Sequence, residues 1–272
     1  MGRFENLEFE EPQRQDELQP GWAPRDEQYY LTLAHEQFQS GEFKVALRYY
    51  SRALEFNAHG LDGWFGQVRM LIELGDYREA GVWVDKALEL FHDHPDLLAA
   101  KAVALARAGN TDKALQLSDA AVQQPGNTPY VWLARGEVLL ALRQANDEYC
   151  FSKAQASAGT RDWFLLLTIA RVYYFYRQAA KALTYLQQAL MLRQTSPYLW
   201  CIQGDCQLAV GLAAGAVHSY EQALTFDRRC AHAAGALARL RDRGILSRIA
   251  AGVKGFLARL GAPPSWRPPA SS

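Results

Sequence analysis

The sequence lacks net charge, because 29 Lys and Arg residues balance 29 Asp and Glu residues. It also lacks long apolar runs. No stretch is long enough for a transmembrane helix, and residues 1–24 contain no run typical of a signal peptide. A zero net charge argues against a uniformly basic nucleic-acid binder. We therefore expect a cytoplasmic protein without a membrane-spanning segment.

Cysteine is scarce, and its spacing indicates little chemistry. A structural zinc site needs four convergent ligands, commonly in close pairs, and the His92-x-His94 pair has no such companions. We expect reduced, half-buried thiols, no metal site and no cofactor. The four cysteines, none in a Cys-x-x-Cys pair, are Cys150, Cys201, Cys206 and Cys230.

Catalytic motifs are missing as well. The sequence has no phosphate-binding glycine loop, no nucleophile elbow and no His-Glu metal motif. Its six histidines are scattered along the chain. His35 and Glu36 are adjacent, and adjacent side chains on a helix point apart. We therefore predict no catalytic residues and a protein that is not an enzyme.

What the sequence does contain is an internal repeat with a period of 34 residues. The segment GEFKVALRYYSRALEF (41–56) returns as GDYREAGVWVDKALEL (75–90) and, more loosely, further along the chain. Large and small residues recur in fixed columns over six copies, and this unbroken register predicts a repeat array. The large column is Tyr30, Trp64, Leu98, Trp132, Leu166 and Trp200, and the small column is Ala34, Val68, Ala102, Gly136, Ala170 and Gly204.

Each copy contains two helical stretches separated by a turn. Glycine stands at the turn in four copies, where the backbone needs a residue that tolerates positive φ. Proline stands at the start of the first helix in three copies, where its missing N–H costs nothing. The glycines are Gly41, Gly75, Gly109 and Gly211, and the prolines are Pro95, Pro129 and Pro197.

This pattern resembles the tetratricopeptide repeat (TPR) family over roughly residues 27–240. The first-helix pairs Trp64/Val68, Trp132/Gly136 and Trp200/Gly204 match its motif, as do the trios Ala46/Tyr50/Ala53 and Ala216/Tyr220/Ala223. The resemblance implies an all-α fold, a right-handed superhelical solenoid of about six helix-turn-helix repeats with C-terminal capping helices. It also implies a concave groove, lined by the first helices, that binds peptides or partner helices.

The expected organisation has five parts. An acidic segment, residues 1–24, which we expect to be disordered, precedes six repeats within residues 25–228. A capping helix (229–243), an amphipathic basic helix (244–261) and a Pro-rich tail (262–272) follow. The repeats are expected at about 27–60, 61–94, 95–128, 129–162, 163–196 and 197–230.

The fourth copy departs from the motif. Glu148, Ser152 and Gln155 stand where small and large apolar residues are expected, and a slip of one residue recovers Phe151 and Ala154. We therefore expect a shifted second helix and a weaker joint between the front and back halves.

Repeats four to six carry the richest set of groove candidates. Aromatic and Arg residues are enriched at binding hot spots, and alternating charges can fix the register of an extended partner. The alternative is that these charges pair with one another and that the aromatics are core between the helices. The candidates are Tyr130, Leu133, Glu137, Phe164, Leu167, Arg171, Tyr174, Phe175, Tyr198 and Asp205, with Phe65 and Arg69 as a second contact.

The two ends of the chain differ in charge. Residues 1–24 have a net charge of −4, the repeat body (25–227) also −4, and residues 228–272 +8. We expect Ala234 and Ala238 to take the first-helix columns in the capping helix. In residues 245–260 an apolar stripe opposes basic residues, so this helix either extends the cap or binds an anionic membrane or a partner groove.

Together these features predict a non-enzymatic scaffold or adaptor that binds a peptide or partner segment in the concave groove, as part of a multiprotein complex. The alternative is a membrane-recruited assembly factor or chaperone that uses residues 245–260. RNA binding is disfavoured because the repeat body has no basic stripe. TPR domains that clamp chaperone C-termini carry Lys and Asn on successive first helices. The matching columns here hold Leu31/His35, Phe65/Arg69 and Ala99/Val103.

Overall fold

The computed structural model describes residues 25–159 and 161–242, and this part of the chain is helical throughout its regular structure. A further helix begins at residue 231 and continues to residue 242, where the described part ends. The labelled helices are α1 (Glu27–Gln39), α2 (Phe43–Phe56), α3 (Leu61–Leu74), α4 (Tyr77–Leu90), α5 (Pro95–Arg107), α6 (Thr111–Gln123), α7 (Pro129–Ala141), α8 (Asp147–Ala158), α9 (Trp163–Phe175), α10 (Ala179–Leu192), α11 (Pro197–Ala209) and α12 (Ala213–Phe226).

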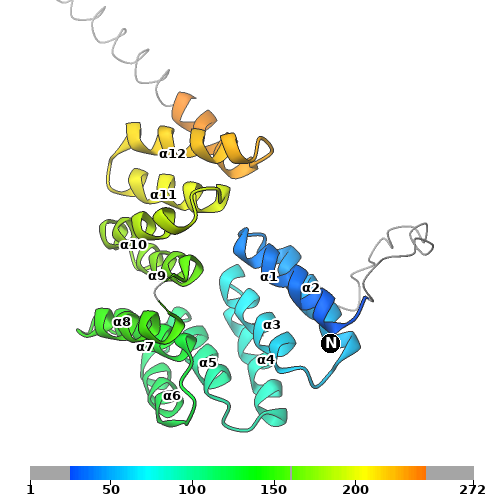
Figure 1. The fold of residues 1–272 in the computed structure, drawn as a ribbon. Coiled ribbons are helices and arrows are strands. Elements are labelled where there is room, and N and C mark those ends of the chain that lie inside the picture. Colours follow the sequence, from blue (N-terminus) through cyan, green and yellow to red (C-terminus); the bar gives the residue numbers. More distant parts are fainter. Residues whose placement is uncertain (1–24, 160, 243–272) are drawn as a thin grey trace, which may run out of the picture.

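The helices pack in consecutive pairs, and the pairs stack along the chain (Figure 1). Odd-numbered helices are the first helices of the repeats and even-numbered helices are the second. Each pair buries its small columns against its partner, with Ala46 and Ala80 fully buried in α2 and α4. The expected fold class, an all-α repeat solenoid, is confirmed.

The starts of the first helices follow from their local sequences. Proline occupies the first turn of α5, α7 and α11, where no intrahelical N–H bond is lost. In α1 the carboxylate of Asp26 accepts a hydrogen bond from the backbone N–H of Tyr29, 2.9 Å away. In α9 the Asp162 carboxylate accepts from the N–H groups of Phe164 and Leu165. These caps satisfy N–H groups that the helix itself leaves free.

The turn between the two helices of each repeat contains one residue in the left-handed region. Glycine fills this position in four repeats, as the sequence predicted. Arginine fills it in the other two, where the backbone adopts the same conformation despite a Cβ atom. The φ angles are 81° at Gly41, 85° at Gly75, 88° at Gly109, 54° at Arg143, 63° at Arg177 and 83° at Gly211.

The fourth repeat is slipped by one residue in its second helix. Phe151 and Ala154 are fully buried in α8, whereas Ser152 is exposed. A Cβ atom on Gly136 would lie 2.5 Å from the Phe151 ring, much as one on Gly204 would lie 2.6 Å from the Tyr220 ring. Phe151 therefore takes the place that tyrosine holds in the sixth repeat. The slip leaves α8 with little contact to α9.

The helix of residues 231–242 covers the last repeat. Ala233 and Ala236 are buried against Ala216 and Tyr220 of α12. The expected columns, Ala234 and Ala238, are exposed instead, so the register of this helix differs from that of a regular first helix. The amphipathic helix expected at 244–261 and both expected tails lie outside the described residues.

The solenoid curls until its first repeat touches its fifth and sixth (Figure 1). Phe38 of α1 meets Phe164 of α9 edge to face, with ring centroids 4.8 Å apart. Phe43 at the start of α2 meets Tyr198 of α11 at 6.2 Å. A Cβ atom on Gly41 would lie 2.5 Å from the Tyr198 ring. The weak joint between α8 and α9 is thus bridged from across the curl.

Alanine substitutions at two turn glycines separate backbone strain from this contact. Both positions have positive φ, so each substitution should destabilise the fold by about 1 kcal/mol or more. Gly109→Ala meets open space, because nothing lies within 4 Å of the added Cβ. Gly41→Ala also collides with Tyr198, so we expect it to lower the free energy of unfolding clearly more, as measured by urea denaturation. Equal losses in the two variants would mean that the first and sixth repeats do not touch in solution.

Candidate partner-binding site

The inner face of the curl is crossed by four ionised side chains, one from each of α3, α5, α7 and α9. Arg107 donates from Nε to Glu137 Oε1 at 2.6 Å, and its Nη1 lies 3.4 Å from Glu73 Oε2. Glu73 also accepts from Arg171, 98 residues further along the chain. We call Glu137, Arg107, Glu73 and Arg171 the ion chain. It links repeats two to five through their first helices.

The ion chain is neutral overall and largely removed from water. Only 2% of the surface of Glu137 is exposed. Burial alone would raise the pKa of Glu73, but Arg171, Arg107 and Arg69 together lower it to about 2. Each carboxylate therefore stays ionised at neutral pH because a guanidinium group lies beside it.

Aromatic rings pack around the arginines of the inner face. The Arg69 guanidinium lies 4.7 Å from the Tyr130 ring centroid and also faces Phe38 and Phe65. Arg171 lies over Phe43 at 4.6 Å and Arg107 over Phe175 at 4.8 Å. Such cation–π contacts stabilise partly desolvated guanidinium groups. Aromatic and ionic contacts together fill the centre of the curl, where the side chains leave about 10 Å³ of free space.

The structure places the predicted groove residues unevenly. Leu133, Glu137 and Leu167 are buried, and Phe175 is exposed, with 43% of its surface accessible. The residues that are partly buried are Phe65, Arg69, Tyr130, Phe164, Arg171, Tyr174, Tyr198 and Asp205. Partner binding through these residues stays a prediction, and most of them already have contacts within the chain.

Asp205, the third charge of the predicted set, lies apart from the ion chain. Its Oδ1 accepts from the Tyr220 hydroxyl at 2.7 Å and lies 3.0 Å from His232 Nε2. The hydrogen bond to this carboxylate and burial have opposite effects on the pKa of His232, and the net result is a raised pKa. Asp205 thereby connects α11 to α12 and to the helix that covers the last repeat.

Glu73 and Arg107 were missed by sequence reasoning. They occupy the column four residues after Arg69 and Val103, which is the same face of the helix one turn later. Extending the predicted inner columns by that turn would have found both, together with Phe175. Their pairing with Glu137 and Arg171 depends on the curl, which no local pattern encodes.

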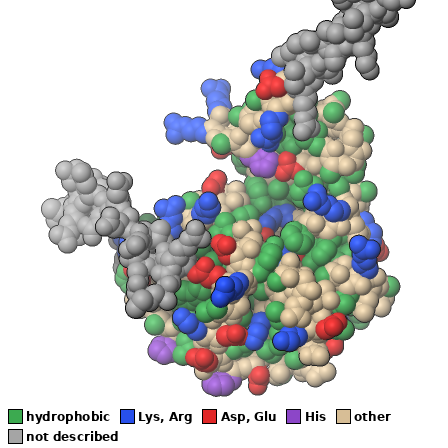
Figure 2. Space-filling view, turned by 180° about the vertical axis from the view of Figure 1, so that it is seen from behind, with side chains coloured by type: hydrophobic (Ala, Val, Ile, Leu, Met, Phe, Trp, Pro, Cys, Tyr) green, Lys and Arg blue, Asp and Glu red, His purple; other side chains and the backbone are tan. Residues whose placement is uncertain are grey.

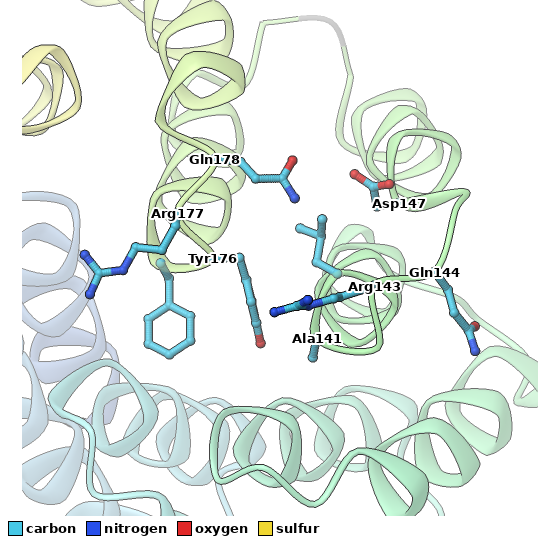
Figure 3. A pocket seen from close by; sticks show the side chains of 9 residues that line it. Ala141, Arg143, Gln144, Asp147, Tyr176, Arg177 and Gln178 are labelled. Atoms are coloured by element: carbon cyan, nitrogen blue, oxygen red, sulfur yellow. The ribbon is translucent and has the colours of Figure 1, made fainter. Parts of the chain in front are cut away.

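Two open clefts flank the exposed Phe175. The first, which we call the turn cleft, has a volume of about 650 Å³ and is lined by the α7–α8 and α9–α10 turns (Figure 3). The second, the inner cleft, has a volume of about 520 Å³ and reaches from Tyr174 and Arg177 to Glu73 and Tyr77. Phe175 and Arg177 line both clefts. Accessible space therefore lies at the rim of the curl, not at its centre.

The described residues contain no group of three or more His, Cys, Asp or Glu side chains that could hold a metal ion. In the same part of the chain, no helix combines the length and the apolar character needed to cross a bilayer.

Comparison with known proteins agrees with the helix pairing. A sequence model of the tetratricopeptide repeat matches residues 71–138. A TPR protein from Parabacteroides merdae shares the fold, with a TM-score of 0.50 at 17% identity, over 80% of this chain and 85% of that chain. The chain is a tetratricopeptide-repeat protein. TPR proteins are in general scaffolds for protein–protein interaction, without catalytic function.

Two other solved structures were compared with this TPR protein. TTC0263 from Thermus thermophilus is 18% identical, with a TM-score of 0.47 over 79% of this chain and 98% of that one. PilW, a type IV pilus biogenesis factor, is 16% identical, with a TM-score of 0.48 over 79% of this chain and all of that one. No curated protein sequence matches the chain significantly.

Replacing Glu73 should expose the contribution of the ion chain to the stability of this TPR protein. Glu73→Gln leaves Arg171 without its carboxylate, and breaking a buried pair costs about 3 kcal/mol. Because Glu73 has a lowered pKa in the folded state, its contribution is present above the ordinary value of 4.5. It is lost as the pH falls towards 2. The stability difference between wild type and variant should shrink over that range, as measured by urea denaturation.

Asp85→Asn provides the matched control. Asp85 pairs with Lys101 at 2.6 Å, but its side chain is 56% exposed. Its loss should cost less than about 1 kcal/mol. If Glu73→Gln were as mild as this control, the ion chain would not form in solution.

Proposed function

We propose that the protein is a non-enzymatic scaffold that binds a segment of a partner protein at the rim of its concave face, beside Phe175. The observation that carries this proposal is an exposed phenylalanine between two open clefts, on a surface whose centre is filled. Aromatic side chains in such positions commonly act as anchors for a partner.

The filled centre directs a partner to the rim. A segment entering the centre would have to separate the ion chain, and breaking one buried pair costs about 3–5 kcal/mol. A segment binding beside Phe175 breaks no ion pair of the described residues. Tyr174 and Tyr176 extend the aromatic surface on either side of Phe175 and line the inner cleft and the turn cleft, respectively.

The predicted contacts from repeats four and five fit this location in part. Tyr174 and Phe175 line the clefts, and Arg171 forms part of the inner cleft while it remains in the ion chain. We keep the remaining groove residues as secondary contacts in the proposal. A cytoplasmic location and membership of a multiprotein complex are expectations from the sequence that complete it.

The alternative functions draw less support from the described residues. Acidic and basic side chains are interspersed over the face shown in Figure 2, and the repeat body has a net charge of −4. This distribution does not favour the phosphate backbone of RNA. Membrane recruitment through residues 245–260 rests on a segment outside the described residues.

Substituting Phe175 tests the proposal. Phe175→Ala should reduce recovery of the partner in quantitative affinity purification from the native cell. Its melting temperature should change little, because the ring is 43% exposed. Phe226→Ala is the matched control, since Phe226 is 42% exposed and lines neither cleft. The proposal fails if both variants recover the same partners in the same amounts as the wild type.

A further inference from the structure

Two arginines occupy turn positions where the other four repeats have glycine. Arg143 follows α7 and Arg177 follows α9, with φ angles of 54° and 63°. A non-glycine residue in this region costs about 1–3 kcal/mol, and such strain is concentrated at functional sites. Glycine would be the less strained residue at both turns, so the arginine side chains call for an explanation beyond the fold.

Both arginines belong to a duplicated tripeptide, Arg-Gln-Ala, at 143–145 and 177–179. The two copies lie one repeat apart, and the Arg and Gln side chains of both line the turn cleft. In Figure 3, Tyr176 lies between Arg143 and Arg177, and Arg143 points toward it. Gln178 points into the cleft from the end of α9. An aromatic surface is thus flanked by two cations and accompanied by carboxamide groups.

The charges of Arg143 and Arg177 are not neutralised nearby. Neither forms an ion pair with any described residue, in contrast to Arg107 and Arg171 of the ion chain. Asp147, the acidic residue of the turn cleft, is already engaged. It accepts from the Tyr173 hydroxyl at 2.8 Å and lies 3.8 Å from Lys181 Nζ. The cleft therefore presents two exposed guanidinium groups that a negatively charged ligand can pair with.

We propose that the turn cleft binds an extended acidic segment of a partner protein, an inference that rests on the rim-binding function above. Carboxylates of the segment pair with Arg143 and Arg177, and an apolar side chain between them packs on Phe175 and Tyr176. Gln178 and Gln144 hydrogen-bond to the backbone of the segment, because a carboxamide both donates and accepts.

An acidic protein segment fits this cleft better than a nucleic acid does. Affinity for a phosphate backbone requires several cations in a row. Here two cations are accompanied by Asp147, and Glu73 lies in the adjoining inner cleft. Carboxamide groups suit a peptide backbone, and charge-assisted pairing with Arg suits carboxylates.

The test uses the full chain and a fluorescein-labelled peptide, Glu-Glu-Phe-Glu-Glu-Phe-Glu-Glu, in an anisotropy titration. We expect saturable binding that weakens as salt is added. In the double variant Arg143→Gly/Arg177→Gly, affinity should fall at least about tenfold, because charge-assisted hydrogen bonds are lost. The urea midpoint of this variant should stay unchanged or rise, since glycine relieves the strain at positive φ. A purely structural role for the arginines would lower that midpoint.

Controls separate the cleft from general electrostatics. Arg48→Gln/Arg78→Gln removes the same charge from exposed positions on α2 and α4 and should leave peptide affinity unchanged. A peptide with Gln in place of Glu should bind at least about tenfold more weakly.

The inference is overturned if the glycine variant binds the acidic peptide as well as wild type does. It is also overturned if a single-stranded RNA binds more tightly than the peptide and loses affinity in the same variant. If Phe175→Ala loses the native partner while the glycine variant keeps it, the rim-binding function stands and the acidic chemistry is wrong.

Discussion

The buried ion chain determines how the six repeats are arranged. Four charged side chains from four successive first helices alternate in sign, and each has a partner within the chain. Because leaving any of them unpaired in a buried environment is costly, the helices that carry them must stay close. The curl, the filled centre and the open rim all follow from this arrangement.

The ion chain also compensates for a weak place in the solenoid. The slipped α8 packs poorly on α9, so a simple linear array would flex there. Glu73 and Arg171 hold the second repeat to the fifth, and the Phe38–Phe164 contact holds the first to the fifth. A repeat array ordinarily gains stability from neighbours alone, whereas this one adds contacts between distant repeats. The rim is therefore preorganised, which reduces the entropy lost when a partner binds.

Most of the fold could be predicted from the sequence because it is encoded locally. The period, the small columns and the turn glycines are properties of single helix pairs, and the slip at Phe151 was visible as a break in one column. The site was harder. The columns that face inward were found, but the tightness of the curl decides whether an inward side chain meets a ligand or another repeat. Glu137 and Arg171 look free in the sequence because their partners, Arg107 and Glu73, stand in a different column. Arg143 and Arg177 were overlooked because they occupy a column noted only for its glycines.

The central claim is that Glu73 and Arg171, 98 residues apart, pair directly in the folded protein. A double-mutant cycle with Glu73→Gln and Arg171→Gln, followed by urea denaturation at neutral pH, measures that pairing most directly. The account predicts a favourable coupling energy of about 1–3 kcal/mol, because the two side chains interact in a buried environment. Additive effects of the two substitutions, with no coupling, would contradict it.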